Sequence, residues 1–65
     1  MTKKVYEVIE LLEANGWKYQ RTKGDHHIFM KEGARRSVPV PGNRNKTVPA
    51  GVLSAILRET GLKIQ

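Results

Sequence analysis

The chain offers few side chains for covalent or acid–base chemistry, and these few exclude most enzyme classes. It contains no cysteine, and its two histidines, His26 and His27, are adjacent. Neighbouring residues of a strand point to opposite faces, so two adjacent histidines do not chelate one metal ion in regular strand geometry. The serines, Ser37 and Ser54, do not lie on a sharp nucleophile turn. The sequence therefore predicts no metal site and no cofactor.

A histidine among positive charges suits the cleavage of RNA. RNA carries its own nucleophile, because the 2′-hydroxyl attacks the adjacent phosphate, and a protein need only move protons and stabilise charge. Imidazole, with an ordinary pKa of about 6.5, acts as base or acid near neutral pH, and Arg or Lys stabilises the phosphate. The turn Lys23–Asp25 leads directly into the histidines. Alone, this pattern is weak, because an exposed strand histidine is more often inert.

The charge balance also points to a polyanionic partner. Twelve Lys and Arg against six Asp and Glu give a formal net charge of +6. Such an excess favours nucleic acid, although it also suits an acidic protein partner or serves solubility. The basic residues dominate the middle of the chain, whereas most acids lie near its ends. No segment approaches the roughly 20 apolar residues of a membrane span, and no signal peptide is evident.

Periodicity predicts a helix at each end of the chain. Apolar residues at helical spacing indicate a first helix over residues 3–14, with Thr2 as its cap and Asn15–Gly16 as its end. Pro49 suits the first turn of a second helix, which Gly61 ends and onto which Leu62 folds back. The apolar positions of the two helices are Val5, Val8, Ile9 and Leu12, and Val52, Leu53, Ile56 and Leu57.

Between the helices, alternation predicts three strands over residues 17–22, 26–31 and 35–40. Short connections make neighbouring strands antiparallel. Pro39 and Pro41 cannot donate ladder hydrogen bonds, so the third strand should lie at an edge. The expected fold is α+β, in the order α-β-β-β-α, as one domain over residues 1–65. Two helices cover one face of a three-stranded antiparallel sheet.

The alternation also assigns side chains to faces. We expect Trp17 and Tyr19 to fill the core, with Arg21 on their side of the strand. In the second strand, His26 shares the inward face with Ile28 and Met30, and His27 shares the open face with Phe29. On that open face, Phe29 either stacks a base or packs against a bound antitoxin or under its own loop, and these alternatives stay open.

Four segments in order resemble the HicA toxin family, also called YcfA-like. The segment Lys23–Phe29 looks like the family's Gly-Ser-His-His-Ile-Phe signature, and Arg36–Pro41 looks like its third strand. The segments Leu11–Trp17 and Gly51–Leu62 resemble its first helix and its closing helix. The resemblance implies a double-stranded-RNA-binding-like fold and a cytoplasmic toxin of a type II toxin–antitoxin system. Such toxins are endoribonucleases (mRNA interferases) that cut mRNA without a metal and are neutralised by a HicB-type antitoxin.

The resemblance also implies roles for residues. The histidine immediately before Ile28, His27, takes the catalytic place. Asp25 stands where the motif commonly has serine, and Pro41 stands where many relatives have a further histidine, so the proton donor is water, a lysine or His27 itself. Basic residues flanking this site are expected to contact the RNA backbone. The expected nucleic-acid-binding residues are Lys23, Gly24, Lys31, Arg35, Arg36 and Lys46.

Two other functions fit the same residues. A noncatalytic RNA- or ribosome-binding module needs the same fold and charge but no catalytic histidine. A pure interaction protein needs only a basic face for an acidic partner. The family resemblance favours the nuclease.

Overall fold

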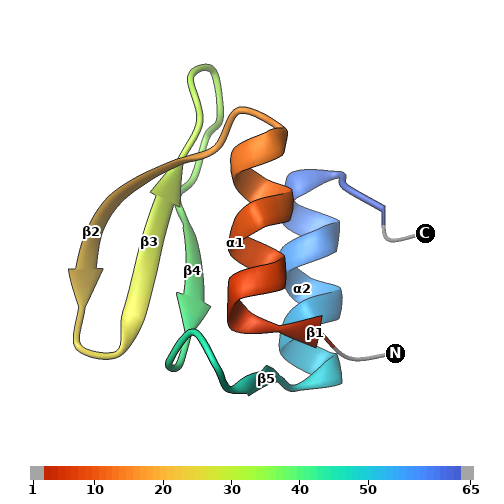
Figure 1. The fold of residues 1–65 in the computed structure, drawn as a ribbon. Coiled ribbons are helices and arrows are strands. Elements are labelled where there is room, and N and C mark those ends of the chain that lie inside the picture. Colours follow the sequence, from red (N-terminus) through yellow and green to blue (C-terminus); the bar gives the residue numbers. More distant parts are fainter. Residues whose placement is uncertain (1–2, 64–65) are drawn as a thin grey trace.

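The computed structural model describes residues 3–63. Its elements in chain order are β1 (Lys3–Lys4), α1 (Val5–Ala14), β2 (Lys18–Lys23), β3 (His26–Met30), β4 (Val38–Pro41), β5 (Thr47–Val48) and α2 (Ala50–Thr60). Strands β2, β3 and β4 form an antiparallel sheet, and both helices lie on one side of it (Figure 1). The α+β class and the helix–sheet layering expected from the sequence are thus confirmed. No helix in residues 3–63 is long and apolar enough to cross a membrane.

The sheet has the order β2-β3-β4, so β4 is an edge strand. This agrees with the expectation from Pro39 and Pro41. Proline has no backbone N–H, whereas a central strand donates ladder hydrogen bonds to the strands on both of its sides. The opposite edge is β2, which stands farthest from the helices (Figure 1). Every residue of β2 is exposed, because no helix covers this strand.

The core lies between the helices and the inner face of β3 and β4. Helix α1 buries its whole predicted stripe, whereas α2 buries Leu53 and Ile56 and packs Val52 and Leu57 partly buried against the core. Trp17 is also buried, at 5% exposed. Because Leu62 packs against this core, the fold-back expected after Gly61 is confirmed. The core residues are Val5, Val8, Ile9, Leu12, Trp17, Phe29, Val38, Val40, Val48, Leu53 and Ile56.

The start of the chain differs from the prediction. Lys3 and Lys4 do not open the first helix, because they pair with Val48 and Thr47 in a two-stranded ribbon, β1–β5. Helix α1 begins at Val5, and the carboxylate of Glu7 accepts a hydrogen bond from the backbone N–H of Lys4 at 2.9 Å. Thr2, the predicted cap, lies outside the described residues. The ribbon was not predicted, since two-residue strands carry no periodic signal.

The third strand is shorter than predicted. It begins at Val38 rather than at Arg35, so Arg35 and Arg36 belong to the connection between β3 and β4. The buried positions Val38 and Val40 alternate with Pro39, as the sequence indicated.

Candidate active site

The faces of β3 are the reverse of the prediction. In the antiparallel register, His27 lies opposite Val40 and Phe29 lies opposite Val38. Directly opposed residues share a face, and both valines are buried in the core beneath the helices. His27 and Phe29 therefore point to the helix side and not to the open face. Phe29 is 1% exposed and belongs to the core, so the open-face roles expected for it are wrong.

His26 consequently lies on the outer face, where it is exposed, and the prediction of an inward-facing His26 is wrong. The alternation of apolar and polar residues predicted the wrong inward face because β3 carries apolar residues on both faces. Ile28 is itself only 7% exposed, although it does not join the core cluster. Its cross-strand neighbours Arg21 and Pro39 lie on either side of it on the outer face.

A β-bulge in β2 determines which residue lies beside His27. The register shifts between Tyr19 and Arg21, so that Tyr19 lies opposite Phe29 and Thr22 lies opposite His27. The extra residue moves Arg21 to the other face from Tyr19, contrary to the regular alternation that we predicted. Tyr19 is also 53% exposed rather than part of the core, since β2 extends beyond the helices.

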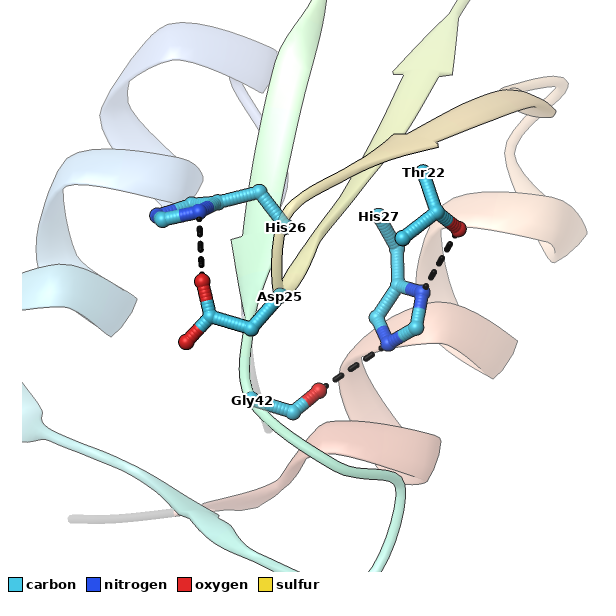
Figure 2. Close-up of polar contacts among 5 residues, drawn as sticks. All are labelled: Thr22, Asp25, His26, His27 and Gly42. Carbon is cyan, nitrogen blue, oxygen red and sulfur yellow. Dashed lines mark hydrogen bonds and ion pairs between the residues drawn. The ribbon is translucent and has the colours of Figure 1, made fainter.

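The imidazole of His27 is half-buried and contacts two other segments (Figure 2). Its Nε2 lies 2.9 Å from the carbonyl oxygen of Gly42. A carbonyl only accepts hydrogen bonds, so Nε2 carries a hydrogen and donates it. In the neutral ring, Nδ1 is then the basic nitrogen. Nδ1 lies 3.5 Å from Oγ1 of Thr22.

Two hydroxyl groups extend this contact. Oγ1 of Thr22 lies 2.6 Å from the hydroxyl of Tyr19, and either oxygen is able to donate. The bulge makes this contact possible, because it places residues three apart on the same face of β2. The result is a chain of polar contacts from Tyr19 through Thr22 to His27 and Gly42. Sequence spacing gave no sign of it.

The loop that carries Gly42 is held to the start of α1. The N–H groups of Val5 and Tyr6 have no partner within the helix, and they donate to the carbonyls of Lys46 (2.8 Å) and Arg44 (3.1 Å). The N–H of Gly42 donates to the carbonyl of Asp25 at 2.9 Å. These contacts fix the carbonyl that meets His27.

A cleft of about 340 Å³ opens beside His27, between α1 and the inner face of β2 and β3. Among the described residues that line it, Arg44 is the only cation and Glu13 is the only carboxylate. The cleft thus combines an imidazole, a guanidinium and hydroxyl groups. Its lining residues are Ile9, Glu13, Tyr19, Thr22, His27, Phe29 and Arg44.

Comparison with protein-family models matches residues 5–62 to the HicA toxin of bacterial toxin–antitoxin systems. The chain belongs to the HicA toxin family. The match covers nearly the whole chain and confirms the resemblance seen in the sequence. Membership makes the chain a toxin of a toxin–antitoxin system and implies an antitoxin partner. A search of curated proteins found no match.

Both departures from the HicA motif lie on the His26 side of the sheet. The Asp25 carboxylate contacts Nδ1 of His26 at 3.0 Å, and the rings of His26 and His27 point in opposite directions (Figure 2). Pro41 lies opposite His26 in the ladder. Asp25 therefore pairs with the outer histidine and not with His27. In residues 3–63, no three His, Asp or Glu side chains gather as a group that could hold a metal ion.

The expected nucleic-acid-binding residues of this HicA-family chain do not form one cluster. Lys23 lies opposite His26 and therefore shares its outer face, Gly24 lies in the β2–β3 turn, and Lys46 lies in the loop after β4. Lys31, Arg35 and Arg36 follow the other end of β3 and line a separate hollow of about 650 Å³. Four residues of strand place Lys31 roughly 13 Å from His27.

Proposed function

We propose that this HicA toxin is a metal-independent endoribonuclease that cuts mRNA in the cytoplasm, with His27 as its general acid and base. The observation that carries the proposal is the orientation of the imidazole. The Gly42 carbonyl holds Nε2–H, and Nδ1 is left as the basic nitrogen of a residue that lines a cleft with Arg44. A side chain can act as a general base only where its basic nitrogen is free to meet the proton that it removes, and a suitable pKa is a second requirement.

The reaction is an internal transesterification. Nδ1 of His27 takes the proton of the 2′-hydroxyl while O2′ forms a bond to phosphorus and the bond from phosphorus to O5′ breaks. The leaving O5′ receives a proton, either from the imidazolium or from water. The products are a 2′,3′-cyclic phosphate and a 5′-hydroxyl end. Arg44 supports the charge on the nonbridging phosphate oxygens.

We further propose that the antitoxin is a HicB-type protein that covers the His27 cleft. The toxin carries a net charge of +6, so an acidic antitoxin surface is steered toward it at low salt and more slowly at high salt. Lys23 is exposed opposite His26 on the outer face, so it offers a first contact beside the cleft rather than within it. Antitoxin and RNA then compete for the same cleft.

The proposal is tested with purified toxin and mRNA in excess EDTA. We expect cleavage under these conditions, products with cyclic phosphate ends, and no cutting where the nucleotide on the 5′ side is 2′-deoxy. The variant His27→Ala should cut roughly 100- to 10,000-fold more slowly, which is the usual contribution of a general acid or base. An absolute requirement for Mg²⁺, or 5′-phosphate ends, would contradict the mechanism. RNA binding without cleavage would identify a noncatalytic RNA-binding module.

A further inference from the structure

The His27 cleft shares lining residues with other hollows beside the edge strand β2. A second hollow, of about 330 Å³, shares Tyr19 with the cleft. The second hollow shares Lys31 and Glu32 with the third, the hollow of about 650 Å³ that Arg35 and Arg36 line. These three hollows, joined through shared lining residues from His27 over Tyr19 to Arg35 and Arg36, pass around the edge strand β2, and we call this series the β2 track.

The side chains of the β2 track combine an exposed ring with cations. Tyr19 lies where the first two hollows meet, and its ring contacts Phe29 edge to face, with centroids 6.0 Å apart and an interplanar angle of 72°. Because Phe29 is fixed in the core, this contact orients the half-exposed Tyr19 ring. Lys18 lines the track beside it, and Lys31 follows.

The far end of the track has an unpaired hydrogen-bond donor. Trp17 is 5% exposed and lines the third hollow, and its Nε1 is buried without an acceptor in the part of the chain that the structure describes. A buried donor without a partner costs stability. Lys31, Arg35 and Arg36 surround the same hollow, together with Glu32 and Glu59.

We propose that a single strand of RNA runs from the His27 cleft along the β2 track. One base stacks on Tyr19, and Lys31, Arg35 and Arg36 bind backbone phosphates away from the scissile bond. The inference rests on the proposed function, since the track starts at the cleft where the RNA is cut. A groove of cations with an exposed aromatic ring is the common arrangement for single-stranded nucleic acid. A single strand fits it because its unstacked bases are free to stack on a side chain.

The test measures binding of a labelled 2′-O-methyl RNA of about eight nucleotides, a length within the common range for single-strand grooves. This RNA lacks the nucleophile and is not cut. The variant Arg35→Gln with Arg36→Gln is compared with Arg58→Gln with Lys63→Gln, which removes the same charge from exposed residues outside the track. In the first variant, the slope of log K against log salt should fall by about 1.4, because each single-strand phosphate contact contributes about 0.7. In the second, the slope should change less.

A second pair of variants tests the base at Tyr19. Tyr19→Phe keeps the ring and should bind the octanucleotide as the wild type does. Tyr19→Ala should bind it roughly 5- to 150-fold more weakly, as expected for one lost stacking contact. The Arg35 and Arg36 substitutions should not alter binding of a dinucleotide, which is too short to reach them from the cleft. Circular dichroism checks that each variant is folded.

The outcomes separate this proposal from the cleavage proposal. If the wild type cuts no RNA but the binding pattern appears, the cleavage mechanism fails and the track stands. If the wild type cuts RNA but the Arg35 and Arg36 variant keeps the full salt slope, the track is wrong. If that variant loses antitoxin and binds RNA unchanged, the surface belongs to the antitoxin, which also overturns the proposal.

Discussion

Nε2 of His27 donates a hydrogen bond to the carbonyl of Gly42 at 2.9 Å, so a residue in the loop after β4 determines which ring nitrogen is basic. The loop is able to present this carbonyl because Gly42 has a φ of +90°, a conformation that side chains with a Cβ rarely adopt. The orientation of the imidazole therefore depends on a glycine fifteen residues away in the sequence.

The variant Gly42→Ala tests this dependence. We expect it to lower the free energy of unfolding by about 1–3 kcal/mol through backbone strain, and to slow RNA cleavage by displacing the carbonyl. The matched control is Gly61→Ala, because Gly61 also has a positive φ, +73°, but ends α2 and lines neither the cleft nor the β2 track. It should cost similar stability in thermal melts but leave cleavage intact. Equal losses of activity in both variants would count against the Gly42 contact.

His26→Ala should leave both stability and cleavage nearly unchanged. The imidazole is exposed and its contact with Asp25 is a surface pair, for which the free energy of unfolding should change by no more than about 0.5 kcal/mol. Chemical denaturation of His26→Ala beside the wild type measures this. A large loss of stability would mean that His26 packs inward after all.

Arg44→Gln should slow cleavage while the fold persists. Arg44 is the one cation that we place at the reacting phosphate, and removing a single such donor commonly costs roughly 100- to 1,000-fold in kcat. Single-turnover cleavage measures the chemical step. Arg58→Gln, an exposed arginine of α2, serves as the control and should cut at close to the wild-type rate. Equal rates for the two variants would remove Arg44 from the mechanism.

Trp17→Phe should cost little stability. The indole is buried, but its N–H has no acceptor in residues 3–63, so the loss of packing area is offset by removal of an unsatisfied donor. Thermal unfolding should show a change within about 1 kcal/mol, whereas Trp17→Ala should lose about 3–5 kcal/mol. A large loss in the phenylalanine variant would show that the N–H is satisfied in solution, for example by water.

The sequence predicted the elements well where a single apolar stripe is unambiguous. The stripe from Val5 to Leu12 gave α1, and Gly61 marked the end of α2. In β3 the same method gave the wrong face, because Ile28 and Met30 compete with Phe29 as candidates for the core. The pairing of β3 with Val38 and Val40 of β4 shows which face of β3 is buried. This register cannot be deduced from the sequence of one strand alone.

The candidate site was predictable only in part. His27 followed from the family motif, and its assignment as catalytic stays a prediction. The residues that contact its imidazole could not be predicted from the sequence. Thr22 lies beside it because of the β-bulge in β2, and Gly42 contacts it from the loop after β4. Glu13 lines the cleft from a helix position that looked like ordinary solvent-exposed surface. No local pattern encodes contacts made between segments far apart in the chain.

The hydrogen bonds between the first turn of α1 and the loop after β4 also bear on when the toxin becomes dangerous to the cell that makes it. The partners are Val5 with Lys46 and Tyr6 with Arg44, so the loop is fixed only when residues from both halves of the chain are present. A nascent chain on the ribosome that exposes the histidines but not this loop has no carbonyl to orient the imidazole. Under the proposed mechanism, the imidazole of His27 is therefore oriented for cleavage only after synthesis has passed Lys46, well beyond the point at which the histidines themselves are made.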